Sequence, residues 1–245
     1  MGHITSTFRS FINECRVFLS YRANRTYVVF VVSFLIFYQS LQYFLKHPTW
    51  YVTFSPELTI WLQKHLSTPS LDIALSVYYP VGFIACLILL NYLMVKQGKD
   101  GWKWGIAIVF CWLAHFSLEM LFPVAPPLRW ESGARAIRLE MLPFSDILVS
   151  VKYGGLPSGH FGYVFLGFLI ARYNYLKTNM SSYRRYMWFL LVNLIITTFT
   201  VFYLGEHTWE DVAASVVIFG GIYLIVSKFV TAHYKNANCP NPESA

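Results

Sequence analysis

The sequence predicts an all-α membrane protein: a six-transmembrane-helix bundle with an N-terminal interfacial helix. Of its 245 residues, 56% are hydrophobic and only 13% are charged, whereas soluble domains carry roughly a quarter charged residues. Aromatic residues make up 19%, and amphipathic Trp and Tyr rings favour the two membrane interfaces. The net charge of +7 comes from basic residues between the apolar stretches, which favours contact with lipid headgroups over binding of nucleic acid.

The first segment, residues 1–25, has apolar and polar side chains on opposite faces of a helix. This pattern is typical of an amphipathic helix on the cytoplasmic membrane surface, and it fits a short cap packed on the bundle equally well. The apolar face carries Phe8, Phe11, Ile12, Cys15, Phe18 and Leu19, and the polar face carries Arg9, Asn13, Arg16 and Ser20.

Six apolar stretches follow, each close to the ~20 residues with which a helix crosses a bilayer. Lipid offers no hydrogen-bond partners to the backbone, so these stretches are predicted to be helices. They make up a membrane domain of residues 26–235, and a flexible cytoplasmic tail is predicted for residues 236–245. The stretches are residues 26–45, 72–95, 104–123, 160–176, 187–204 and 210–231.

The distribution of Lys and Arg predicts the orientation. Most of these residues lie before the first stretch, between the second and third, between the fourth and fifth, and after the sixth. Cytoplasmic loops are enriched in Lys and Arg, so both termini are predicted to be cytoplasmic. The loops 125–159 and 205–209 then face the outside or a lumen. The sequons at Asn24 and Asn179 fall on the cytoplasmic side and are predicted to stay unmodified.

A first candidate for chemistry is the segment Gly155-Leu156-Pro157-Ser158-Gly159-His160, which enters the fourth stretch. Ser158 is a good N-cap, and the first amides of a helix, with its positive dipole end, suit an anion such as phosphate. His160 would stand beside that anion. The plain alternative is a surface or capping histidine at a helix start.

A second candidate is the segment Gly205-Glu206-His207-Thr208-Trp209-Glu210-Asp211, which enters the sixth stretch. His207 and Asp211 are four residues apart and share one helical face. A carboxylate bonded to one ring nitrogen would leave the other nitrogen free as a nucleophile. The alternative is a His–Asp pair that merely closes the helix start.

The Pro-Ser-Gly-His motif followed by His-x-x-x-Asp resembles the type 2 phosphatidic acid phosphatase superfamily of membrane lipid phosphatases and phosphotransferases. The segment Phe122-Pro-Val-Ala-Pro-Pro127 is similar to the inositol phosphorylceramide synthase-like branch. The resemblance covers about residues 104–225. It implies that the membrane domain is catalytic, that a phosphohistidine intermediate forms, and that no metal or other cofactor is needed.

The resemblance also implies roles for single residues. His207 would attack phosphorus, Asp211 would orient it and balance its charge, and His160 would protonate the leaving oxygen and then activate the acceptor. Ser158 and the amide of Gly159 would hold phosphate oxygens.

This chain departs from the superfamily pattern in its cations. The phosphatases carry Lys-x6-Arg-Pro before the first histidine motif and Ser-Arg before the nucleophile, and neither occurs here. Arg129 is the best replacement phosphate ligand, because guanidinium binds phosphate as a fork, and Lys152 is a further one. Arg135 and Arg138 are weaker candidates, expected to meet headgroups at the membrane interface.

His115 and Glu119, four residues apart in the third stretch, are a further polar pair. Ionisable groups inside a membrane face a bundle interior or a cavity, so the two could bind a headgroup or an acceptor. A structural hydrogen-bonded pair is the favoured alternative. Glu206 and Glu210 flank the nucleophile and are expected to point away from phosphate or to hold basic residues.

The sequence therefore predicts a membrane enzyme acting on a lipid whose tails stay in the bilayer. Its phospho group would pass to water, as in a phosphatase, or to an alcohol such as inositol or another polyol. A non-catalytic lipid-binding or lipid-moving protein with the same fold is the main rival. A small-solute transporter is disfavoured, because the polar motifs gather at one face instead of lining the mid-membrane.

Overall fold

The computed structural model describes residues 2–44, 50–129, 132–145 and 154–238. These ranges are helical apart from turns, loops and two isolated β-bridges, which join Val124 to Val52 and to Gly154. The predicted all-α class is therefore confirmed.

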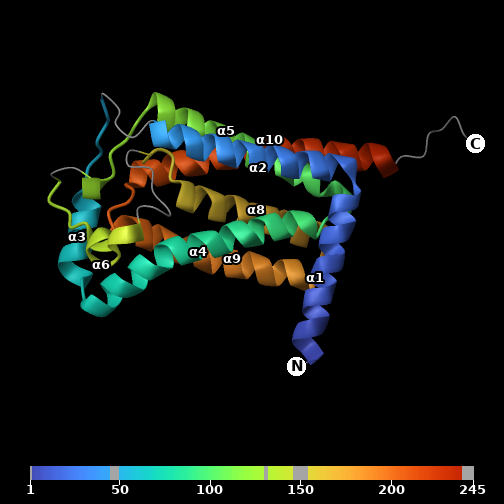
Figure 1. The fold of residues 1–245 in the computed structure, drawn as a ribbon, viewed down its shortest axis with the longest axis horizontal. Coiled ribbons are helices and arrows are strands. Elements are labelled where there is room, and N and C mark those ends of the chain that lie inside the picture. The colour runs from blue at the N-terminus through green and yellow to red at the C-terminus, as the bar shows by residue number, and fades with distance from the viewer. Residues whose placement is uncertain (1, 45–49, 130–131, 146–153, 239–245) are drawn as a thin grey trace, which may run out of the picture.

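Within the described ranges, six long helices run side by side (Figure 1). Among the described residues, four helical stretches are long and apolar enough to cross a membrane: Pro69–Val95, Gly98–Leu121, Ser181–Tyr203 and Trp209–Thr231. They correspond to the second, third, fifth and sixth predicted stretches, and they indicate an integral membrane protein. The long helices are α2 (Arg22–Phe44), α4 (Pro69–Val95), α5 (Gly101–Leu121), α8 (Gly159–Thr178), α9 (Ser181–Tyr203) and α10 (Trp209–Asn238).

Shorter helices cover the two ends of the bundle. Helix α1 (Gly2–Ser20) crosses one end, steeply inclined to the long helices, while α3 (Glu57–Leu66) and α6 (Ile137–Met141) lie at the other (Figure 1). Helices α8 and α10 both begin at the end that carries α3 and α6. The two histidine motifs are therefore gathered at the end of the bundle opposite α1.

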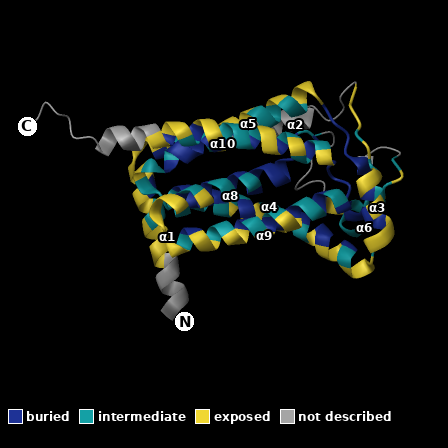
Figure 2. Cartoon of the chain, turned by 180° about the vertical axis from the view of Figure 1, so that it is seen from behind, coloured by how far each residue is buried: buried dark blue, intermediate teal, exposed yellow. Residues whose placement is uncertain are grey.

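Helix α8 is the central helix, with much of its surface buried against α4, α9 and α10 (Figure 2). Its close contact with α10 depends on Gly162, because a Cβ there would lie 2.6 Å from the Phe219 ring. Leu166 and Ile170 continue the same core further along α8. A helix buried in this way can carry small and polar residues that a lipid-facing helix could not, which fits the absence of α8 from the four apolar stretches named above.

The corner between α1 and α2 is held by the buried side chain of Asn24. Its Nδ2 donates to the carbonyl oxygens of Phe18 and Gly98 at 2.8 and 2.9 Å, and its Oδ1 accepts from the amide of Trp102 at 3.1 Å. One side chain thereby joins α1, the start of α2 and the turn η1 (Gly98–Asp100) that precedes α5. The C-terminal part of α1 is thus packed on the bundle.

Replacing Asn24 with Ala should destabilise the protein, because buried backbone groups would lose their partners at about 1–3 kcal/mol each. A loss near 3 kcal/mol corresponds to a fall in Tm on the order of 10 °C for a chain of this size. Thermal unfolding in detergent measures this. The control is Asn91→Ala, since in the described part of the chain the Asn91 side chain donates only to the carbonyl of Leu87, one turn back in its own helix. Equal shifts in the two variants would contradict the role given to Asn24.

Candidate active site

His207 lies in a short turn between α9 and α10 that is fixed by its own backbone. The amides of Glu206 and His207 both donate to the carbonyl of Val201, at 3.0 and 3.2 Å. Gly205 has a φ of 72°, in the left-handed region that favours glycine, and this allows the chain to reverse there. The imidazole of His207 is buried and held in one place.

The ring of His207 is oriented by a backbone carbonyl. Its Nδ1 lies 2.9 Å from the carbonyl oxygen of Gly155. Because a carbonyl oxygen can only accept, Nδ1 carries the proton and donates it. The lone pair then belongs to Nε2, and this is the tautomer that a nucleophilic histidine needs.

Asp211 combines the two interpretations that the sequence left open. Its Oδ2 accepts from the amide of Thr208 at 2.8 Å and lies 3.3 Å from the Thr208 hydroxyl, which is a capping box at the start of α10. The same oxygen lies 3.5 Å from Nδ1 of His207. The carboxylate therefore closes the helix start and also places a negative charge beside the imidazole, while the hydrogen bond itself goes to Gly155.

Gly155 owes its position to the proline-rich segment that leaves α5. Its amide donates to the carbonyl of Val124 at 3.1 Å, and the backbone of Val52 bonds on either side, to Pro123 and Ala125, at 2.9 Å each. A Cβ on Gly155 would come within 2.8 Å of the Val124 side chain. The segment thus acts as a backbone scaffold that brings the Gly155 carbonyl to the ring of His207.

The start of α8 is fastened to α10. The hydroxyl of Ser158 caps α8 by accepting from the amide of Phe161 at 3.4 Å, as the sequence predicts. The amide of Ser158 donates to the carbonyl of Asp211 at 3.2 Å, and the hydroxyl of Ser215 donates to the carbonyl of Ser158 at 3.0 Å. The two motifs are therefore parts of one rigid assembly.

His160 is buried between aromatic rings of α4. Its ring stacks on Tyr79 with centroids 3.9 Å apart and planes 21° apart, and the Phe83 centroid lies 4.1 Å away. Within the described part of the chain, its Nε2 is buried without a hydrogen-bond partner. A buried nitrogen without a partner is costly, so a ligand that bonded Nε2 would remove that cost.

The two imidazoles are close enough to contact one phosphate group. Their ring centroids lie 6.3 Å apart and their planes are inclined by 52°. Reacting atoms approach to about 3–3.5 Å before bond formation, so two such contacts span roughly 6–7 Å. Placing one ring on the attacking side and the other beside the leaving oxygen is therefore geometrically feasible.

Arg138 lies elsewhere than the sequence predicts. Instead of meeting headgroups at the interface, its guanidinium is fully buried and donates from Nε to the carboxylate of Glu206. Its Cζ also lies 5.3 Å from the centroid of Tyr79, the ring on which His160 stacks. Glu206 holds a basic residue, as expected, and this brings a cation next to both histidine motifs.

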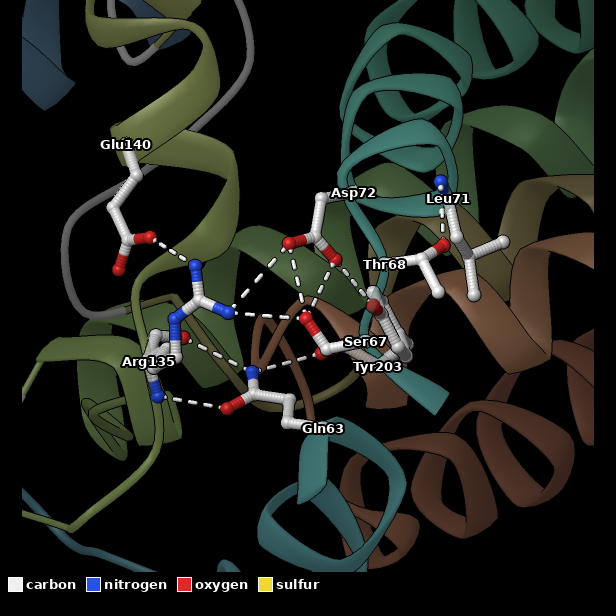
Figure 3. Close-up of polar contacts among 8 residues, drawn as sticks. All are labelled: Gln63, Ser67, Thr68, Leu71, Asp72, Arg135, Glu140 and Tyr203. Atoms are coloured by element: carbon white, nitrogen blue, oxygen red, sulfur yellow. Dashed lines mark hydrogen bonds and ion pairs between the residues drawn. The ribbon is translucent and has the colours of Figure 1, made fainter. Parts of the chain in front are cut away.

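Arg135 is half-exposed and joins a polar network at the N-terminal end of α4 (Figure 3). Its guanidinium lies 2.6 Å from the Glu140 carboxylate, 3.0 Å from the Ser67 hydroxyl and 3.6 Å from the buried Asp72 carboxylate. The hydrogen bond that Arg135 donates to Glu140 raises the pKa of Arg135, so the guanidinium stays charged. These contacts give Arg135 a structural task.

The same network fixes α6 relative to α3 and α9. Gln63 accepts from the amide of Arg135 at 2.7 Å and donates to the carbonyls of Arg135 and Tyr203 at 3.0 and 2.9 Å. The phenol of Tyr203 donates to Asp72 (Figure 3). The segment that carries Arg138 and the turn that carries His207 are therefore held to the same side chains.

His115 and Glu119 lie beside the start of α8. Nε2 of His115 is 3.1 Å from Oε1 of Glu119, within ion-pair distance, but among the described residues it has no well-formed hydrogen bond. The imidazole also packs against Gly159, where an added Cβ would lie 2.5 Å from Cε1 of His115. The pair is thus next to the residue that precedes His160, a proximity that the sequence spacing alone could not reveal.

The remaining candidates are only partly located. Arg129 ends the short 3₁₀ helix η2 (Pro127–Arg129), and its side chain lies outside the described part of the structure. Lys152 also lies outside the described residues. Sequence reasoning missed the Gly155 carbonyl, the stacking of Tyr79 on His160 and the burial of Arg138. A backbone acceptor leaves no signal in the sequence. For Arg138, its charge was the signal that made it a candidate, and nothing in the sequence indicated its burial.

Comparison with known proteins shows a family match that covers most of the chain. The sequence profile of the PAP2 superfamily matches residues 49–225, a range that contains both histidine motifs and the proline-rich segment. No curated protein and no solved structure matches the chain.

Replacing Gly159 with Ala should cost about 1–3 kcal/mol of stability, because the added methyl overlaps the His115 ring. In a His115→Ala background the same substitution should cost clearly less, since the ring is gone. Melting temperatures of the four proteins in this cycle measure the difference. Gly221→Ala is the control, because a Cβ there has no atom within 4 Å. An equal cost of Gly159→Ala in both backgrounds would contradict the contact.

Proposed function

The chain belongs to the PAP2 superfamily, and from this membership we propose a membrane enzyme that cleaves a lipid phosphoester or pyrophosphate bond. The superfamily indicates a phosphatase-type or phosphotransferase-type activity. One observation carries the more detailed proposal: His160 and His207 lie with centroids 6.3 Å apart, and His207 has its Nδ1 proton committed to Gly155. This pair can serve a single phosphorus atom from two sides.

In the first step, Nε2 of His207 attacks phosphorus and a phosphorus–nitrogen bond forms. The bond from phosphorus to the leaving oxygen breaks, and His160 donates a proton to that oxygen. The imidazole of the phosphohistidine is then positively charged, with the Asp211 carboxylate 3.5 Å from Nδ1 to balance it. The lipid alcohol or phosphate that leaves stays in the bilayer.

In the second step, an acceptor hydroxyl gives its proton to His160, and its oxygen attacks the same phosphorus. The phosphorus–nitrogen bond breaks and both histidines return to their starting states. Water as acceptor makes the protein a lipid phosphatase, and an alcohol such as inositol or another polyol makes it a phosphotransferase. The proline-rich segment supports placing the chain near the inositol phosphorylceramide synthase-like branch.

The phosphate oxygens are proposed to be held by Ser158, by the amide of Gly159 and by cations. Arg129 and Lys152 remain the candidates that the sequence favours. The burial of Arg138 beside Tyr79 and Glu206 supports adding it to them. A buried guanidinium binds phosphate more strongly than an exposed one, because water competes less.

The membrane arrangement is part of the same proposal. Helices α2 and α8 complete a six-helix transmembrane bundle, and the enclosed position of α8 supports this despite its lower hydropathy. Helix α1 lies in the cytoplasmic interface, an assignment supported by its exposed Phe11 and Ile12 and its course across the bundle end. Both termini are then cytoplasmic, and the site faces the outside or a lumen.

A phosphorus-labelled lipid tests the covalent step. Phosphatidic acid, phosphatidylinositol and a polyprenyl pyrophosphate, each ³²P-labelled, are offered to the purified protein, and acid-labile label on the chain is counted after quenching. Wild type should carry label, His207→Ala should carry none, and His160→Ala should be labelled about 10²–10⁴ times more slowly.

His65→Ala is the control, since His65 is an exposed imidazole on α3 that bonds only the carbonyl of Trp61 in the described structure. It should be labelled at the wild-type rate. Label that persists in His207→Ala would contradict the assignment of the nucleophile. An unlabelled wild type with bound lipid would favour a non-catalytic lipid-binding protein.

The role of Arg138 is tested with its partner. Arg138→Gln leaves Glu206 buried without its cation, which costs about 3–5 kcal/mol of stability. Arg138→Gln combined with Glu206→Gln removes both charges and should recover most of the melting temperature. Labelling should stay 10- to 100-fold slower than wild type, because the charged hydrogen bond to phosphate is absent, at roughly 1.5–3 kcal/mol. A double variant labelled at the wild-type rate would leave Arg138 with a structural role only.

A further inference from the structure

His115 and Glu119 have no role in the two steps proposed above, although they lie beside the start of α8. We propose that this pair on α5 is the subsite for the acceptor, and that it binds the hydroxyl group to which the phospho group passes in the second step. The ligand class is a neutral alcohol, in contrast to the anionic phosphate held by α8 and α10. This inference rests on the proposed function and specifies its acceptor side.

The pair lies next to the start of α8. The His115 ring packs so closely on Gly159 that an added Cβ would come within 2.5 Å of Cε1. Gly159 opens α8 and directly precedes His160, the residue that takes the acceptor's proton. A hydroxyl bound at His115 therefore stands near the base that must deprotonate it and the phosphorus that it must attack.

The carboxylate of the pair favours a neutral ligand. The Glu119 side chain is only 8% exposed and lies 3.1 Å from Nε2 of His115. A buried carboxylate repels a phosphate group, so Glu119 is a poor phosphate ligand. It can accept a hydrogen bond from a hydroxyl group, since ionised carboxylates only accept hydrogen bonds. The pair thus favours neutral alcohols and disfavours a second phosphate in the same place.

The imidazole of His115 is incompletely hydrogen-bonded among the described residues. Nε2 of His115 is buried without a well-formed hydrogen bond inside the described ranges, although Glu119 is within ion-pair distance. Its Nδ1 is 3.5 Å from the phenol of Tyr163, which is at the limit of a hydrogen bond. Ionisable groups within a helix bundle are costly unless they are well paired, so such a loosely paired imidazole indicates a place for a ligand.

The reaction stays balanced with this addition. The acceptor's oxygen–hydrogen bond breaks, the proton passes to His160, the oxygen–phosphorus bond forms and the phosphorus–nitrogen bond of His207 breaks. His115 and Glu119 hold the hydroxyl in position and take no proton. They are binding residues for the acceptor and should not influence the first step.

The experiment separates the two steps on one preparation. The purified chain is labelled with the ³²P-lipid that gives the highest yield, and the label is chased with water alone or with glycerol as the probe alcohol. Free phosphate and phosphoglycerol, or the corresponding phosphodiester, are then quantified. The variants are Glu119→Gln and His115→Gln, which keep size and hydrogen-bonding capacity while changing charge and geometry.

Both variants should be labelled within about threefold of wild type and should still release label to water. Transfer to glycerol should fall on the order of 10- to 100-fold relative to hydrolysis, seen mainly as a higher KM for glycerol, since a charged hydrogen bond to the hydroxyl is lost. Ser117→Ala is the matched control, because Ser117 is an exposed residue of the same helix. It should leave the ratio unchanged.

Three results would overturn the subsite. Variants that lose labelling as fully as His207→Ala would place the pair in the first step or in folding. An unchanged ratio of glycerol transfer to hydrolysis would remove its role toward the acceptor. Wild-type label that leaves only as free phosphate, whatever alcohol is offered, would also refute it. A wild-type chain that never carries label refutes the proposed function itself, so the two failures are distinguishable.

Discussion

The candidate site depends on one hydrogen bond, from Nδ1 of His207 to the carbonyl of Gly155. This bond fixes both the tautomer and the plane of the imidazole ring. With the other tautomer or a flipped ring, the wrong nitrogen would face a ligand. The carbonyl can reach the ring only because Gly155 lies against Val124 with no Cβ between them. The small bridged layer around Val52 and Val124, formed by segments distant in sequence, thus has a direct effect on the imidazole.

The second constraint is the cost of burying charge. An unpaired charge in this setting would be expensive, so Arg138 is paired with Glu206, and Asp72 with Tyr203, Ser67 and the exposed Arg135. These pairs tie α6, α4 and the end of α9 to one another (Figure 3). The turn that carries His207 is therefore held both by the bridged layer, through Gly155, and by this network, through Tyr203.

Much of this could be predicted from the sequence. Long apolar stretches identify membrane helices reliably. The two motifs each open a helix, so their side chains lie close together when those helices start at the same end of the bundle. Helices α3 and α6 escaped prediction because they are too short for a periodic signal. The burial of Arg138 escaped because it depends on Glu206, 68 residues away, and no local pattern encodes that contact.

More acidic than basic side chains lie near the two imidazoles among the described residues. Among the described residues there, Arg138 is the cation, while Glu206, Asp211 and Glu119 are carboxylates. A phosphate dianion would be repelled by this set unless His160 is protonated and further cations approach, as proposed for Arg129 and Lys152. Glu206 and Asp211 already have partners in Arg138 and the Thr208 cap. Glu119 is paired with His115, which packs on the start of α8, so its charge lies where we propose the second reactant binds and favours a neutral hydroxyl there.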